Sequence, residues 1–312
     1  MWLQRYTNYL LNHRLLAITL TFAITFVPIL GVLGILYAAL VTLVQRVMLG
    51  ALFTLAATLP YLISFIISGS HPHTLPLLIW AAIGVAVLSN VLTWAFAIIL
   101  RREPNWRLIL ESAALLGVLV VSVIHLIYPD VAVWWEKTLQ SYYTQAELVV
   151  NQAQTQPLPS LPNSLEIIQA KSQYATGVMT TGILCSVILQ LIMARWWQAI
   201  VFQPGLLRQE LHHIRLSQLS SVLFIISFGL QYLGNNVILD IMPILYVLFG
   251  AAGLSLIHYM FDAIHSPTGW FWLTIIYLTL FLSLPVSIIV LSVLAILDSW
   301  FDLRKRFRAT LK

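Results

Sequence analysis

The sequence predicts an all-α, polytopic membrane protein with about ten transmembrane helices. Of the 312 residues, 60% are hydrophobic and only 9% are charged, and the mean hydropathy is +0.90. An average soluble domain is about 45–50% apolar and about 25% charged, so a soluble fold of this length would expose a large apolar surface. The same composition excludes intrinsic disorder and a coiled coil. The single cysteine, Cys185, permits no intramolecular disulfide.

Eight apolar runs separated by polar clusters are the candidate spans. Six are close to the roughly 20 residues that cross a bilayer core. The runs 15–44 and 268–302 would form single helices of about 45 and about 52 Å, against a core of about 30 Å. Each contains breakers near its middle, Pro28 with Gly31 in the first and Pro285 in the second, so we expect two pairs of short helices. The eight runs are 15–44, 47–68, 77–100, 108–128, 173–194, 217–233, 237–260 and 268–302.

The basic residues support this division. With both long runs split, the chain has ten spans, both termini lie in the cytoplasm, and 14 of the 16 Lys and Arg residues lie on the cytoplasmic side. With neither run split there are eight spans, and the clusters at 101–107 and 195–215 then face outward, against the positive-inside rule. The net charge of +5 therefore indicates orientation in the bilayer, and we predict no nucleic-acid partner.

The predicted topology divides the chain into two membrane halves of five spans each and one sizeable extracytoplasmic loop between them. These parts are 1–128, 129–171 and 172–312. The first half begins with a short helical hairpin. The second half contains an amphipathic cytoplasmic loop, 195–216, that is expected to lie in the membrane interface. Trp196 and Trp197 lie near the end of a span, where indole rings are favoured, and are candidate interface residues.

The extracytoplasmic loop contains a predicted amphipathic helix. Trp135, Leu139 and Tyr142 follow one another by four and three residues, which places them on one helical face and makes them candidate partner or interface residues. The proline-rich stretch 156–162 ends this helix. We interpret the helix either as a cap that lies on the membrane surface or as a lid or partner-docking helix, because long loops often carry function.

Three ionisable residues near the inner end of the span 237–260 have a spacing that would align metal ligands. His258, Asp262 and His265 stand at i, i+4 and i+7, on one helical face. Three ligands from one helix match known site geometries weakly, so the favoured interpretation is that these residues mark the membrane boundary. The sequence also lacks P-loop, dinucleotide-binding, zinc-protease and nucleophile-elbow motifs. We therefore predict no enzyme activity, no metal and no cofactor.

Four polar residues are candidates for lining a pore or binding a ligand. Asn236 and Asp240 lie at the outer start of the span 237–260, where helix capping by asparagine is the default interpretation and a small-molecule pocket is the alternative. Asn90 and Gln190 lie within other spans and would line a central cavity in a transport protein.

His125 is a further ionisable residue within a span. It lies near the outer end of the span 108–128, on roughly the same face as Glu111. A proton path along this face is one interpretation. The other is a buried, hydrogen-bonded histidine, with Glu111 paired to Arg107 four residues before it.

Two stretches carry a family resemblance. ARWWQAIVFQPGLLRQELHHIRL (194–216) and ILDSWFDLRKR (296–306), with GLSLIHY (253–259) between them, resemble the YybS-like bacterial membrane proteins. The inner-loop motif Asn-Pro-Gly-Gly-Phe of that family appears here as Gln-Pro-Gly-Leu-Leu (203–207), which keeps the turn and loses the aromatic residue. The resemblance implies a multi-pass protein of the bacterial cytoplasmic membrane, and it brings no catalytic residues.

A wider, fold-level resemblance concerns the N-terminal part. The stretch LYAALVTLVQRVMLGALFTLAATLPYLI (36–63) is similar to the membrane substrate-binding subunits of vitamin transporters of the energy-coupling-factor type, and to the rod-shape protein MreD. A likeness at this level implies a fold and carries no site residues.

Two functions are compatible with these observations. The apolar spans and the lack of catalytic motifs favour a structural, scaffolding or accessory component of the cell envelope, whose partners are the lipid bilayer and other envelope membrane proteins. The alternative is a substrate-binding subunit or permease for a small solute. Two halves of five spans with opposite orientation would fit the inverted-repeat design of transporters.

Overall fold

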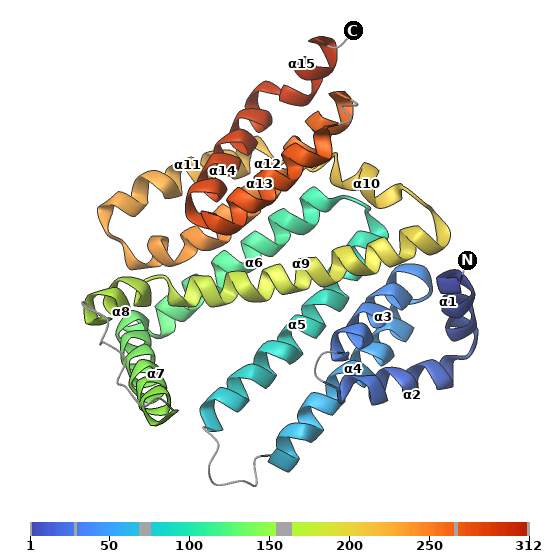
Figure 1. Cartoon of the computed structure of the whole chain (residues 1–312), viewed down its shortest axis with the longest axis horizontal. Helices are drawn as coiled ribbons and strands as arrows, with labels where there is room; N and C mark the ends of the chain where they lie inside the picture. The colour runs from blue at the N-terminus through green and yellow to red at the C-terminus, as the bar shows by residue number, and fades with distance from the viewer. Residues whose placement is uncertain (1, 28–29, 69–75, 154–163, 265–267, 311–312) are drawn as a thin grey trace. The chain divides into compact units, whose positions relative to one another are not determined.

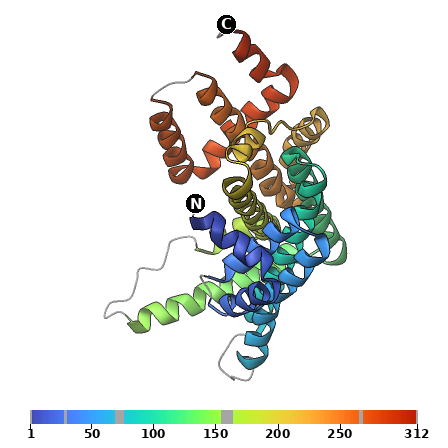
Figure 2. The same cartoon turned by 90° about the vertical axis from the view of Figure 1, so that its right-hand side faces the viewer.

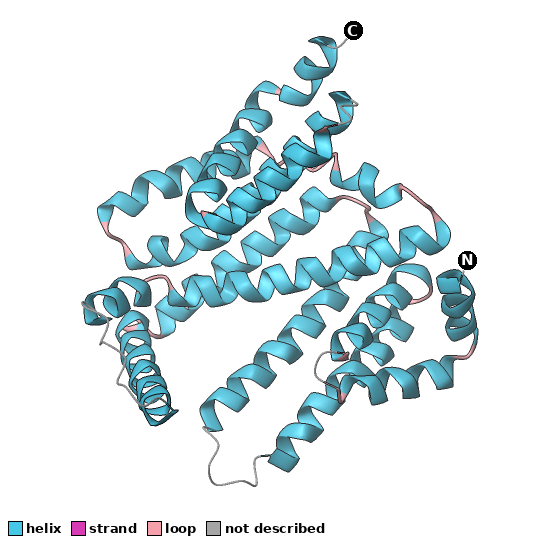
Figure 3. Cartoon of the chain, in the orientation of Figure 1, coloured by secondary structure: helices cyan, strands magenta, loops and turns pink. Residues whose placement is uncertain are grey.

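The computed structural model describes residues 2–27, 30–68, 76–153, 164–264 and 268–310, and in these ranges it contains helices and no strand (Figure 3). Figure 1 labels the helices in chain order. They are α1 (Trp2–Asn12), α2 (Arg14–Thr25), α3 (Gly31–Val44), α4 (Val47–Ser68), α5 (Pro76–Arg102), α6 (Trp106–Ile127), α7 (Val131–Ala153), α8 (Ser164–Ser172), α9 (Ala175–Phe202), α10 (Leu206–Leu211), α11 (Gln218–Leu230), α12 (Asn236–Ile264), α13 (Gly269–Leu282), α14 (Leu284–Phe301) and α15 (Leu303–Thr310), with a 3-10 turn at Gln231–Leu233.

The predicted all-α fold is confirmed for the described residues. Among them, six helices are long and apolar enough to cross a membrane, and four shorter helices are also apolar. The six long segments are Val47–Ser64, Ala82–Arg102, Trp106–Ile127, Ala175–Phe202, Asn236–Ala263 and Leu284–Phe301. The four shorter ones are Arg14–Thr25, Gly31–Val44, Gln218–Leu233 and Gly269–Leu282. The number of ten spans stays a prediction.

Both overlong runs are broken into pairs of helices, as expected. The first run forms α2 and α3, of 12 and 14 residues, which are about 18 and 21 Å long and so shorter than a bilayer core. The second run breaks at Ser283, and Pro285 lies in the first turn of α14, where the ring costs no helical hydrogen bond. Pro28, the other predicted breaker, lies outside the described residues.

The chain forms two compact units that interleave along the sequence. Unit 1 comprises residues 1–109 and 183–214, and unit 2 comprises residues 110–182 and 215–312. The chain passes between them within α6 and within α9. These units are defined by packing, whereas the three-part division 1–128, 129–171 and 172–312 concerns membrane topology and stays a prediction.

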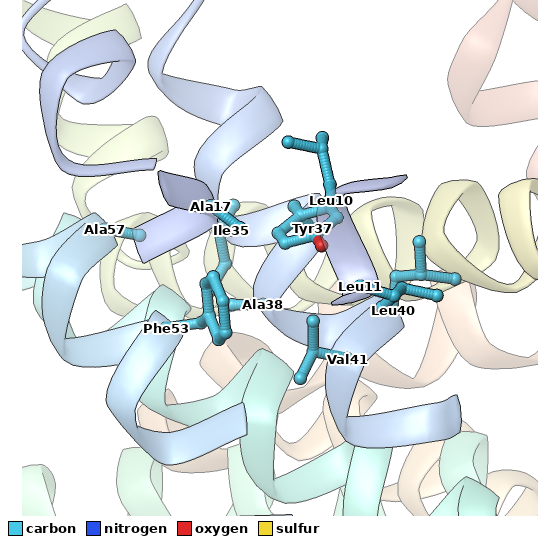
Figure 4. Packing of buried hydrophobic residues seen from close by; sticks show 10 residues of the cluster. All are labelled: Leu10, Leu11, Ala17, Ile35, Tyr37, Ala38, Leu40, Val41, Phe53 and Ala57. Atoms are coloured by element: carbon cyan, nitrogen blue, oxygen red, sulfur yellow. The ribbon is translucent and has the colours of Figure 1, made fainter. Parts of the chain in front are cut away.

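The core of unit 1 is built around α3 (Figure 4). This helix is apolar on all sides, which is typical of a helix that other helices enclose. It packs against α2, α4 and α5, and the rings of Tyr37 on α3 and Phe53 on α4 meet edge to face at 5.3 Å. Between helices in lipid such close packing, rather than the removal of water, supplies most of the attraction.

The core of unit 2 is the pair α12 and α14. Gly253 on α12 lets the backbone of α14 approach so closely that an added Cβ would lie 2.7 Å from the carbonyl carbon of Leu291. A Cβ added at Gly250 would lie 2.8 Å from the side chain of Ile288. Because both contacts advance by three residues on each helix, α12 and α14 run parallel, and α13 returns the chain between them. Small residues thus serve close helix packing here.

Candidate functional site

A chain of buried hydrogen bonds lies at the start of α12 in unit 2. The Asp240 side chain is about 1% exposed. Its Oδ2 lies 3.0 Å from Nε2 of His125 on α6, and its Oδ1 accepts the backbone N–H of Gly177 on α9 at 2.5 Å. A carboxylate can only accept, so the imidazole Nε2 carries the proton of the first bond. One carboxylate therefore joins three helices.

The local structure explains why these groups meet. The side chain of Asn235 accepts the N–H groups of Val237 and Ile238 and so caps α12 one turn before Asp240. Gly177 lies in the first turn of α9, where a helix has backbone N–H groups without an intrahelical partner. Asp240 satisfies one of them, and the positive end of the α9 dipole favours its negative charge. Capping by asparagine, the default interpretation for the start of this helix, is confirmed at Asn235.

The same chain reaches the extracytoplasmic helix α7. Trp135 donates its indole N–H to Oγ1 of Thr176 at 3.0 Å, and Thr176 is the neighbour of Gly177 in the sequence. The base of α7 is thereby fixed to the first turn of α9. All the residues in this chain of contacts belong to unit 2.

The predicted amphipathic helix is present as α7, which runs as one continuous helix (Figure 2). Trp135, Leu139 and Tyr142 are half-buried, whereas Gln140 and Thr144 are exposed. The helix packs against α8. The predicted face is therefore the packed face, as far as the described side chains extend, and the opposite face is polar and open.

The other ligand candidates are engaged in hydrogen bonds between helices. In unit 1, Asn90 donates to Oγ1 of Thr58 at 3.2 Å, and the side-chain oxygen of Gln190 accepts the hydroxyl of Thr93 at 2.6 Å. In unit 2, Asn236 is exposed at the first residue of α12, four residues before the buried Asp240.

The predicted metal ligands do not form a cluster in the described part of the chain, where no group of three His, Cys, Asp or Glu residues could hold a metal ion. Nε2 of His258 lies 2.8 Å from the hydroxyl of Tyr277 on α13. Asp262 takes part in other contacts. His265 lies outside the described residues.

The two candidate interface tryptophans differ. Trp196 is 52% exposed, whereas Trp197 is half-buried and donates its indole N–H to Oγ1 of Thr7 on α1 at 3.0 Å. Trp197 therefore binds α1 to the end of α9, and Trp196 alone presents its ring to the surroundings.

Two contacts were missed by the sequence reasoning. His125 was considered with Glu111 on its own helix, although its partner is Asp240, 115 residues away. Glu210 accepts hydrogen bonds from Arg195 and Trp106. A signal existed for Arg195 with Glu210, since these opposite charges lie on the same predicted side of the membrane.

Comparison of the chain with protein-family models, with curated proteins and with solved structures gives no match. The resemblance of 194–216 and 296–306 to the YybS-like proteins therefore stays a prediction. The geometry indicates a site that holds helices together, because each hydrogen bond described above joins two groups of the protein itself. The buried carboxylate and imidazole are also groups that can accept a proton.

Proposed function

We propose that this chain is a ten-span protein of the bacterial cytoplasmic membrane, related to the YybS-like proteins, with both termini in the cytoplasm. It acts as a structural or scaffolding component of the cell envelope, and α7 is its docking helix on the outer side. The observation that carries the proposal is a set of hydrogen bonds at the N-terminal end of α7. Trp135 of α7 is bonded to Thr176 of α9, and the neighbouring Gly177 is bonded to the buried Asp240 of α12.

Contacts within unit 2 support the topology. The backbone N–H of Ser217 at the start of α11 donates to Glu111 at the start of α6, and both positions are predicted to be cytoplasmic. Arg215 also pairs with Asp302 after α14, on the same predicted side. The contacts of Asp240 join helix ends that are all predicted to face outward. Helix ends assigned to one side by charge alone thus meet in space.

Contacts within unit 1 agree. Gln45 after α3 donates to the carbonyl oxygen of Leu11 at the end of α1, and Trp197 at the end of α9 donates to Thr7. All four positions are predicted to be cytoplasmic. The helices α2 and α3 form an antiparallel hairpin, so the chain returns to the side of the membrane on which it began. This holds even if the short helices do not cross the whole bilayer, and the predicted orientation of the other spans is unchanged.

A docking role follows from the way α7 is held. Its base is tied to α9 through Trp135, and the same turn of α9 is tied to α12 through Asp240. A helix fixed in this way loses little conformational entropy on binding a partner, because it is ordered beforehand. Its open face carries Lys137, Gln140 and Thr144, a polar surface suited to a protein outside the lipid.

A site-specific photo-crosslinker tests this role in intact cells. Placed at Gln140 or Thr144, it should give the same covalent adduct with another envelope protein. Placed at Tyr232, an exposed residue on the predicted outer side of α11 and α12, it should give none. Absence of an adduct from both α7 positions, or equal adducts from Tyr232, would remove the docking role.

A substrate-binding subunit or permease is the second candidate function, and one observation favours it. His125 and Asp240 form a buried ionisable pair within membrane helices, and such pairs often mark substrate or ion pathways. Under this alternative, the protein purified from native membranes would carry a small solute that is lost in Asp240→Asn and retained in Asn236→Ala, a control four residues away. If the purified wild-type protein carries no solute, the result favours the scaffolding function.

A further inference from the structure

A second polar site lies in unit 1, where the turn before α6 faces α10. A pocket of ≈ 320 Å³ opens there between residues 104–107 and residues 206–214. The side chains of Asn105, Arg107 and His213 line it and are exposed. The pocket lies at the level that the charge distribution predicts to be the inner membrane surface.

The one acidic residue in the pocket wall is compensated. Oε2 of Glu210 accepts the indole N–H of Trp106 at 3.0 Å and the Nε–H of Arg195 at 3.1 Å. A second guanidinium nitrogen of Arg195 donates to Oε1, and both side chains of this ion pair are about nine-tenths buried. In this bidentate pair the guanidinium of Arg195 neutralises the negative charge of Glu210. The wall therefore does not repel an anion.

Asn105 and Arg107 provide hydrogen-bond donors in the wall, and the side-chain amide of Gln209 can donate or accept. The side-chain oxygen of Asn105 accepts the N–H of Arg107 at 3.1 Å, which leaves its NH₂ group to donate. Nδ1 of His213 lies 2.6 Å from the carbonyl oxygen of Gln209. A carbonyl only accepts, so Nδ1 carries the proton of this bond. Arg107 adds a guanidinium, a planar group that matches phosphate oxygens.

The surrounding segments are also basic. Residues 101–107 and 195–214 contain five arginines against two glutamates. An excess of arginine beside a membrane raises the local concentration of anionic headgroups. The pocket thus combines a positive field, several hydrogen-bond donors and a compensated acid.

We propose that this pocket binds the phosphate group of an anionic phospholipid headgroup at the inner membrane surface. Free phosphate shares the chemistry of the headgroup. The lipid is the occupant because the pocket lies at the predicted membrane boundary, where anionic headgroups are concentrated.

The test measures lipid binding to the full chain in neutral detergent by native mass spectrometry. Phosphatidylglycerol is titrated into the wild type, into Arg107→Gln/His213→Gln, and into the matched control Arg208→Gln/His212→Gln. The control removes the same residue types from positions that do not line the pocket. We expect the pocket variant to lose at least about tenfold in affinity for phosphatidylglycerol, since it loses charge-assisted hydrogen bonds, and the control to lose less than about twofold.

Three results overturn the proposal. An equal loss in both double variants means that the basic surface attracts lipid without a site. Equal binding of phosphatidylcholine, which is zwitterionic, removes the requirement for an anion. Saturation by inorganic phosphate in a pocket that phosphatidylglycerol does not enter assigns the site to free phosphate. Arg107→Lys guards against a folding artefact: it keeps the charge, and an intermediate loss of affinity is expected because the forked geometry is gone.

Discussion

The two units differ in how many ionisable pairs they bury among their apolar helices. Unit 1 buries one, Arg195 with Glu210, beside neutral groups such as Asn90, which is bonded to Thr58. Unit 2 uses ionisable groups, with His125 on Asp240 toward one end and Arg304 on Asp298, at 2.9 Å, toward the other. A neutral amide in lipid finds substitute partners easily, so its hydrogen bond contributes little. A buried charge that loses its partner finds no substitute, so the loss costs much more free energy. Unit 2 should therefore depend on its two pairs, and unit 1 on a single pair together with the packing around α3.

The largest expected effect is the loss of the carboxylate that joins three helices. Asp240→Ala leaves His125 and the N–H of Gly177 without their acceptor, and we expect the free energy of unfolding to fall by about 3–5 kcal/mol. Asp240→Asn keeps an acceptor in the same place and should lose roughly half as much. Reversible unfolding in mixed detergent and lipid micelles measures both. Equal losses for Ala and Asn would show that shape, and not the acceptor, is what matters.

The next effect concerns the close approach of α9 and α12. A Cβ added at Gly177 would overlap the carbonyl oxygen of Asp240, whereas a Cβ at Gly182, on the same helix, meets nothing within 4 Å. We expect Gly177→Ala to destabilise unit 2 by about 1–3 kcal/mol through overpacking. Gly182→Ala should be neutral or slightly stabilising, because alanine favours the helix. The same unfolding assay compares the two variants, and a harmless Gly177→Ala would contradict the tight contact.

These two predictions rest on contacts that the sequence could not supply. Helix breaks at Ser283 and near Gly31, and the packed face at Trp135 and Leu139, follow from local patterns of breakers and apolar spacing, and so could be predicted. The partnership of His125 with Asp240 depends on which helices become neighbours. That choice is made by shape, for example by the missing side chain at Gly177, which no local pattern reveals.

A smaller effect is expected in unit 1. The coupling between Asn90 and Thr58 should be about 0.6 kcal/mol, the usual size for a neutral hydrogen bond between membrane helices. A double-mutant cycle of Asn90→Leu and Thr58→Val isolates this coupling from the change in volume. A coupling as large as the loss in Asp240→Ala would abolish the contrast between the two units and point to a role for Asn90 beyond helix packing.

The smallest effect belongs to a half-buried ion pair of unit 2, Arg215 with Asp302, outside the membrane helices. Partial burial raises the pKa of Asp302, but Lys305 and Arg215 outweigh it and hold the pKa below its ordinary value. A lowered pKa means that this carboxylate stabilises the fold above its ordinary pKa and loses that contribution as the pH falls through the lowered one. The unfolding midpoint should therefore drop as the pH falls below 3.8, the ordinary pKa of this group. The drop should be smaller in Asp302→Asn, a residue that tolerates the left-handed backbone at this position. Salt screens exposed charges and leaves buried ones nearly untouched, so 0.5 M salt should flatten the dependence on Asp302. If the drop persists in Asp302→Asn and in high salt, a group other than Asp302 is responsible and the prediction is wrong.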